Sequence, residues 1–76
     1  MKELVEYIAK SLASKPEEVN VSEVAEDEGR VILRLEVADE DKGKIIGKQG
    51  RVAEAIRILI RVAAIKEGTR AGLEIV

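Results

Sequence analysis

Two glycines three residues apart constrain the fold of this chain more than any other feature of its sequence. Gly47 and Gly50 stand in the run Ile-Ile-Gly-Lys-Gln-Gly-Arg at 45–51, between two segments with helical character. Glycine lacks a Cβ atom, so it allows a tight turn with positive φ and the close approach of another backbone. Acidic residues at 39–41 suit the start of a short helix, and Gly47 ends that helix after Ile46. The chain therefore has to turn sharply between two helices.

The other segments combine helical and strand patterns. Apolar residues four apart, from Leu4 to Leu12, indicate an amphipathic helix that Pro16 ends. Val31, Leu33, Leu35 and Val37 at alternate positions indicate a strand, and Gly29 supplies the positive φ of a hairpin turn before it. The predicted elements are a helix over 2–14, strands over 19–25 and 31–37, a short helix ending at 46, a long helix over 51–66 capped by Gly68, and a strand over 70–76. Their order is αββααβ.

The long helix has two apolar faces. Ile58, Val62 and Ile65 form an additional apolar strip outside its main face. Two interpretations are open, namely that neighbouring helices cover this strip or that a partner protein does. The main face, expected to lie in the core, contains Val52, Ile56, Leu59, Ile60 and Ala63.

Composition excludes most enzyme classes. The 76 residues suit one domain, and 24 Leu, Ile and Val residues predict an aliphatic core, because Tyr7 is the only aromatic residue. The chain has neither cysteine nor histidine, so we expect no disulfide, no cofactor or metal centre, and no imidazole base. The longest apolar run, from Val62 to Ile65, is far too short to span a membrane. We therefore expect a non-enzymatic, soluble, cytoplasmic protein with no membrane partner.

Charge divides the chain into two unlike halves. Residues 1–41 contain 5 basic and 12 acidic side chains, a net −7, whereas residues 42–76 contain 8 basic and 3 acidic ones, a net +5. This asymmetry suggests an anionic ligand for the second half. The alternative, which charge alone leaves equally open, is a small, well-solvated domain whose many charges only keep it soluble. The acids at 39–41 suggest either a Mg²⁺ or Ca²⁺ site or helix capping, and capping explains them better.

The glycine turn has the chemistry of a phosphate site. A helix N-terminus presents unpaired N–H groups and a partial positive charge, and Lys48 and Arg51 add full charges. The spacing from Gly43 to Gly47 is one residue short of a mononucleotide P-loop, and Gln49 cannot supply its magnesium-binding hydroxyl group. The dinucleotide fingerprint also fails, because this turn joins helix to helix. The expected ligand is therefore a different kind of phosphate.

The segment Ile-Ile-Gly-Lys-Gln-Gly, ahead of a long helix and behind two strands, resembles the GXXG signature of the KH domain. The αββααβ order resembles the type II arrangement of that domain, and the resemblance covers essentially the whole chain. It implies an α+β fold in which residues 1–76 form one KH domain, with a three-stranded sheet and helices packed on one face.

The resemblance also implies a site for single-stranded RNA. The turn at 47–50 would hold the backbone of about four nucleotides, with Ile45 and Ile46 on one wall of an aliphatic groove. The second wall would come from the first strand, near Val21 to Val24. The RNA-binding residues implied in this way are Lys44, Ile45, Ile46, Gly47, Lys48, Gln49, Gly50 and Arg51.

Similarity to bacterial single-KH proteins implies a biological role. It implies an RNA chaperone in post-transcriptional control, linked to cell-envelope homeostasis and cell length. It also implies a homodimer, or a heterodimer with a second KH protein. The alternative is a protein-interaction subunit whose KH fold mainly docks a partner. A lone groove without aromatic residues predicts weak, salt-sensitive RNA binding.

Overall fold

Three helices and three strands follow one another in the predicted order. The computed structural model describes residues 1–76. The elements are α1 (Lys2–Leu12), β1 (Asn20–Glu26), β2 (Arg30–Glu36), α2 (Lys42–Ile46), α3 (Arg51–Glu67) and β3 (Arg70–Ile75). The α+β class and the αββααβ order are therefore confirmed. No helix has both the length and the apolar character needed to cross a membrane.

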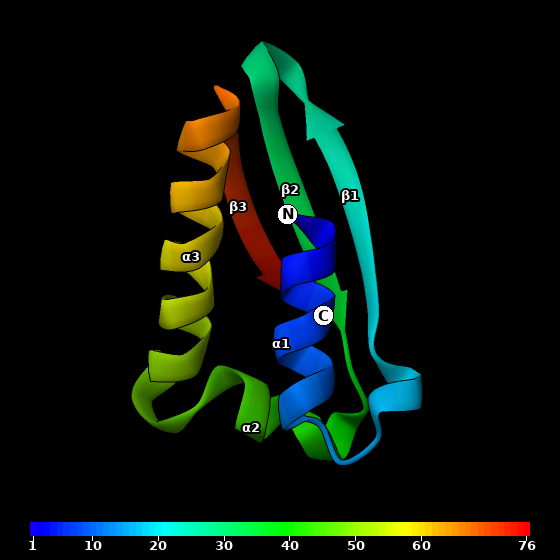
Figure 1. Cartoon of the computed structure of the whole chain (residues 1–76). Helices are drawn as coiled ribbons and strands as arrows, with labels where there is room; N and C mark the ends of the chain where they lie inside the picture. Colours follow the sequence, from blue (N-terminus) through cyan, green and yellow to red (C-terminus); the bar gives the residue numbers. More distant parts are fainter.

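The strands form one mixed sheet in the order β1-β2-β3. β1 and β2 pair antiparallel, whereas β2 and β3 pair parallel, with Arg30 opposite Arg70 and Leu35 opposite Ile75. A parallel pair needs a crossover connection, and α2 and α3 provide it. The helices lie on one face of the sheet, as predicted, with β3 beside α3 and β1 at the far edge (Figure 1).

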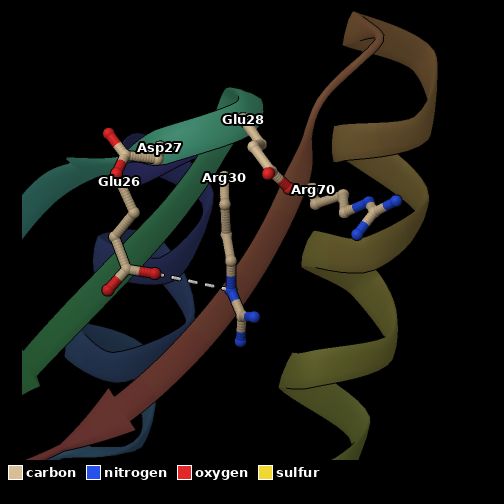
Figure 2. A pocket seen from close by; sticks show the side chains of 5 residues that line it. All are labelled: Glu26, Asp27, Glu28, Arg30 and Arg70. Atoms are coloured by element: carbon tan, nitrogen blue, oxygen red, sulfur yellow. Dashed lines mark ion pairs between the residues drawn. The ribbon is translucent and has the colours of Figure 1, made fainter.

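The hairpin between β1 and β2 turns at Asp27–Gly29. Two consecutive residues, Glu28 and Gly29, have positive φ angles of 65° and 71°. The predicted role of Gly29 is therefore confirmed, and Glu28 shares the left-handed conformation. The Arg30 Nε atom lies 3.6 Å from the Glu26 Oε1 atom across the base of this turn (Figure 2).

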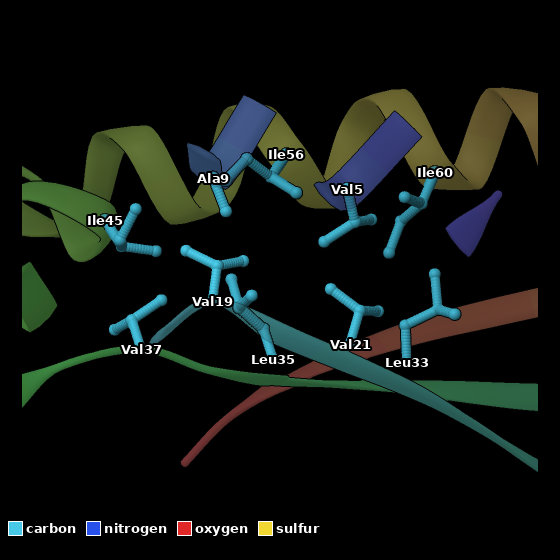
Figure 3. Packing of buried hydrophobic residues seen from close by; sticks show 10 residues of the cluster. All are labelled: Val5, Ala9, Val19, Val21, Leu33, Leu35, Val37, Ile45, Ile56 and Ile60. Atoms are coloured by element: carbon cyan, nitrogen blue, oxygen red, sulfur yellow. The ribbon is translucent and has the colours of Figure 1, made fainter. Parts of the chain in front are cut away.

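The hydrophobic core lies between the sheet and the helices and is entirely aliphatic (Figure 3). Every element except β3 contributes a fully or nearly fully buried side chain to it, and Leu73 and Ile75 of β3 pack against its margin. The ten residues of the core are Val5, Ala9, Val19, Val21, Leu33, Leu35, Val37, Ile45, Ile56 and Ile60.

The buried face of α3 differs from the predicted face by a small rotation. Ala53 and Ala64 are buried together with Ile56 and Ile60, whereas Leu59, which was expected in the core, is 47% exposed. Alanines allow the helix to approach the sheet closely, and the larger side chains beside them lie at the margin of the contact. The prediction for Leu59 was therefore wrong.

The apolar strip of α3 is not covered by neighbouring helices. Ile58, Val62 and Ile65 are 48%, 49% and 69% exposed. The interpretation that other helices of the same chain cover them is therefore wrong, and the strip faces outward.

Candidate nucleic-acid interface

The GXXG turn joins α2 to α3 through three residues with positive φ. Gly47 ends α2 at φ 79° and ψ 170°, and its N–H group donates to the Gly43 carbonyl oxygen at 2.8 Å. Gln49 (φ 58°) and Gly50 (φ 74°) then adopt the left-handed conformation, and the Gly50 N–H group donates to the Gly47 carbonyl oxygen at 3.0 Å. The result is a compact turn directly before the first residue of α3.

Gly47 is the position that most needs glycine. A Cβ atom built there would lie 2.8 Å from both the backbone nitrogen and the Cβ atom of Val52, well inside normal contact distance. Gly50 has open space around it, so only its backbone conformation favours glycine. The first turn of α3 therefore approaches the backbone of the turn closely, and Gly47 makes that approach possible.

The polar side chains of the turn are exposed. Lys48 is exposed and makes no ion pair, and Arg51 donates from Nη2 to the Gln49 Oε1 atom at 3.2 Å. These cations stand beside the N-terminus of α3, a helix of 17 residues with a partial positive charge at this end. The electrostatics of the turn therefore favour an anion.

The other predicted site residues have different surroundings. Ile46 is 40% exposed next to the turn, whereas Ile45 is fully buried in the core. The Lys44 ammonium group donates to the Ser14 hydroxyl oxygen and lies 3.9 Å from the Asp41 Oδ1 atom. Lys44 thus points toward the end of α1, and Ile46 is the isoleucine of the pair that presents an apolar surface to solvent.

Asp41 holds α1 and α2 together, a role that its sequence context did not predict. Its fully buried carboxylate accepts hydrogen bonds from the backbone N–H groups of Ser14 at 2.9 Å and Lys15 at 3.0 Å. These two bonds, assisted by the nearby Lys44 charge, lower the pKa of Asp41. Asp41 makes no side-chain capping bond to α2, so the capping interpretation was wrong for this residue.

The same region contains a second ion pair and no candidate metal site. Lys15 Nζ lies 2.9 Å from Glu40 Oε1, and the hydrogen bond and the charge of Glu40 raise the pKa of Lys15. No group of three or more acidic side chains is placed to hold a metal ion. A backbone-binding carboxylate at the start of a helix has little signal in sequence, because its partners are 26 and 27 residues away.

The strand beside α3 is β3, not β1. The sheet order puts β1 at the opposite edge, with β2 between it and β3. The predicted second wall near Val21 to Val24 was therefore wrong, because Val21 lies in the core and Val24 lies away from α3. β3 is therefore the strand closest to α3, and its unpaired edge lies on the side of the sheet next to that helix (Figure 1).

An αββααβ domain with a GXXG turn between its two crossover helices is a KH domain. A family model described as the KH domain of KhpA/KhpB matches residues 2–75. The chain belongs to this family, which is not an enzyme family.

Curated relatives match this chain over their full length. An RNA-binding protein KhpA from Clostridium perfringens is 58% identical, and one from Clostridium acetobutylicum is 57% identical, each over 100% of both chains. A third, from Caldanaerobacter subterraneus, is 50% identical over 100% of both chains. No solved structure matches the chain.

Proposed function

We propose that this chain binds single-stranded RNA and that the GXXG turn holds the RNA backbone. The observation that carries the proposal is the turn itself. Gly47 keeps it free of a Cβ atom, Lys48 is an exposed cation without an ion-pair partner, and α3 begins directly behind it. Relatives of the same length that bear the name RNA-binding protein KhpA support the choice of RNA.

The chemistry of the turn suits a phosphodiester. The N–H groups at the start of α3 and the Lys48 ammonium group can bind phosphate oxygens, while Ile46 and the edge of β3 offer surfaces beside the bases. Neither the turn nor β3 contains an aromatic side chain for base stacking, because the only aromatic residue is Tyr7 on α1. We therefore expect weak binding that falls as salt rises, since neutralised phosphates release counterions.

A titration of labelled single-stranded RNA at two salt concentrations tests this function. Lys48→Asp/Gln49→Asp should weaken binding by about tenfold or more, because it replaces the cation of the turn by two anions. The matched control is Lys2→Asp/Asn20→Asp, which changes the net charge by the same amount at two exposed positions outside the turn. Circular dichroism checks that both variants fold. Equal RNA binding by wild type and the turn variant would refute the backbone clamp.

The finer biological role is part of the same proposal. The protein acts in the cytoplasm as an RNA chaperone in post-transcriptional control, with a link to cell-envelope homeostasis and cell length. This role rests on the resemblance of the chain to bacterial single-KH proteins. An RNA strand-annealing assay with wild type and the turn variant separates a chaperone, which accelerates annealing, from a protein that only binds.

A partner surface on α3 is a second candidate function. The outward-facing Ile58, Val62 and Ile65 support it, because together with the exposed Leu59 they put four large aliphatic side chains on the surface of one helix within two turns. The occupant is a second copy of this chain or a KhpB-like KH protein, and the family description supports the latter. Two joined grooves would hold a longer RNA more tightly than one, through effective concentration.

A further inference from the structure

A basic pocket lies at the opposite end of α3 from the GXXG turn. It is a cavity of about 290 Å³ where the end of α3 meets the beginnings of β2 and β3. Three arginines from three elements line it, namely Arg30 on β2, Arg61 on α3 and Arg70 on β3. Ala64 and Ile65 add an apolar surface. No acidic side chain lines this cavity.

The charge of this arginine pocket is largely unneutralised. Arg61 and Arg70 are both exposed, and neither lies within ion-pair distance of a carboxylate; the Arg30 Nε atom has Glu26 at 3.6 Å. The hairpin acids line a separate hollow that shares Arg30 and Arg70 with the pocket, and Figure 2 shows Arg70 pointing away from Glu26 toward α3. Two free guanidinium groups therefore remain available to an anion.

Guanidinium groups favour phosphate as the anion. Their planar set of N–H donors matches phosphate oxygens in pairs, and arginine also stacks on exposed nucleobases. A phosphodiester with its base would use both parts of the pocket, the arginines and the apolar surface of Ala64 and Ile65. The acids of the neighbouring hollow would repel the strand on the hairpin side, so its path would run along α3.

The distance between the two basic sites sets the length of RNA that would contact both. Ala64 is thirteen residues after Arg51 in α3, which corresponds to about 20 Å along the helix. β3 runs beside the C-terminal part of α3, from the pocket toward the middle of the helix (Figure 1). A segment of about four nucleotides centred on the turn would cover only part of this interval, whereas a longer strand can continue along α3 and the edge of β3 to the pocket.

We propose that the arginine pocket is a second phosphate-binding site for the RNA strand held at the GXXG turn. The inference rests on the proposed RNA-binding function. The pocket lengthens the RNA footprint of a single domain and adds affinity only for strands long enough to reach it. It thereby offsets the weak binding expected of a groove without aromatic residues.

The test compares RNAs of about four and about twelve nucleotides of one repeated base. Arg61→Gln/Arg70→Gln should bind the short RNA as wild type does and bind the long RNA about fivefold or more weakly. For the long RNA, the slope of log binding constant against log salt concentration should become less steep by about 0.7 for each phosphate that the variant no longer neutralises. The control Lys10→Gln/Arg34→Gln removes the same charge from two residues that do not line the pocket.

The outcomes separate this inference from the proposed function. If Arg61→Gln/Arg70→Gln binds both lengths like wild type, the pocket is no RNA site, while RNA binding at the turn stands. If the variant binds both RNAs more weakly by the same factor, or if the control loses as much affinity for the long RNA as the variant does, the pocket is not a separate anchor. If wild type binds neither length, the RNA-binding function itself fails and the pocket proposal fails with it.

Discussion

Gly47 and Gly50 are equivalent in the sequence motif but differ in what the structure requires of them. Gly47 combines φ 79° with ψ 170°, a conformation that essentially only glycine adopts, and its missing Cβ atom makes room for Val52. Gly50 has φ 74° and ψ 13°, a left-handed conformation that other residues adopt at moderate cost, and nothing lies near its Cα.

Gly47→Ala should therefore destabilise the domain more than Gly50→Ala. We expect about 1–2 kcal/mol for Gly50→Ala from left-handed strain alone. Gly47→Ala should cost about 3 kcal/mol or more, because the strain adds to the collision with Val52. Urea unfolding of the two variants measures the difference. Equal losses of unfolding free energy would show that the contact between Val52 and the turn leaves room for a Cβ atom at position 47.

The site residues themselves were predictable from sequence only in part. The glycine spacing and its charged neighbours identify the turn, because each has a local physical reason. Local sequence does not determine where the side chains of Lys44 and Ile45 point, since α2 has only five residues and too few apolar positions to define a buried face. Its tertiary contacts decide that Ile45 enters the core and that Lys44 reaches Ser14.

At the scale of elements, Asp41 determines how α1 and α2 meet. Its carboxylate is fully buried and binds the backbone of the residues that follow α1. Loss of one such acceptor leaves a buried N–H group without a partner, which costs more than the bond contributes. The position of α2, and with it the start of the GXXG turn, therefore depends on one side chain 26 residues from its partner in the chain.

Asp41→Asn should lower the Tm by about 10 °C or more, because the amide NH₂ group would face backbone N–H donors. The exposed Asp39→Asn is the matched control and should change the Tm little. Folding lowers the pKa of Asp41, so the unfolded state binds the proton more tightly. The stabilisation is thus complete well above pH 4 and is lost as pH falls through the folded pKa.

Urea midpoints of wild type and Asp41→Asn, measured between about pH 3 and 7, check this sign. The gap between the two proteins should be widest near neutral pH and should narrow on acidification. A gap that stays constant or widens toward acid would contradict the assigned role of the carboxylate.

Element order was predictable because each helix and strand has its own periodicity. The turns at Gly29 and Gly68 were predictable for the same reason, since positive φ favours glycine locally. Which strand lies beside α3 was not predictable in this way, because strand order depends on the crossover and not on any one segment. The rotation of α3 that exposes Leu59 likewise results from the small volumes of Ala53 and Ala64 against the sheet.

At the scale of the whole molecule, α3 brings three surfaces together. The GXXG turn lies before its first residue and the arginine pocket lies near its end, while the apolar strip of Ile58, Val62 and Ile65 reaches the pocket at Ile65, which also lines it. The basic half of the chain, with a net charge of +5, contains the turn, the strip and most of the pocket, whereas the acidic half contributes Arg30 of the pocket, the hairpin and α1. RNA binding at the turn and partner binding at Ile58 can therefore be separated by substitutions on the same molecule.

Ile58→Asp should weaken self-association or pairing with a KhpB-like protein by about tenfold or more, because it places a charge within an apolar contact. Sedimentation of the chain alone and mixed with that protein measures the effect. Tyr7→Asp, at a 74% exposed position on α1, is the control that adds an acid elsewhere.

The short RNA that contacts only the turn should bind Ile58→Asp almost as it binds wild type, since the variant changes no residue of the turn. If wild type stays monomeric and unpaired, or if both variants associate like wild type, the strip is not a partner surface. The exposed isoleucines would then be ordinary surface residues of a domain that works alone.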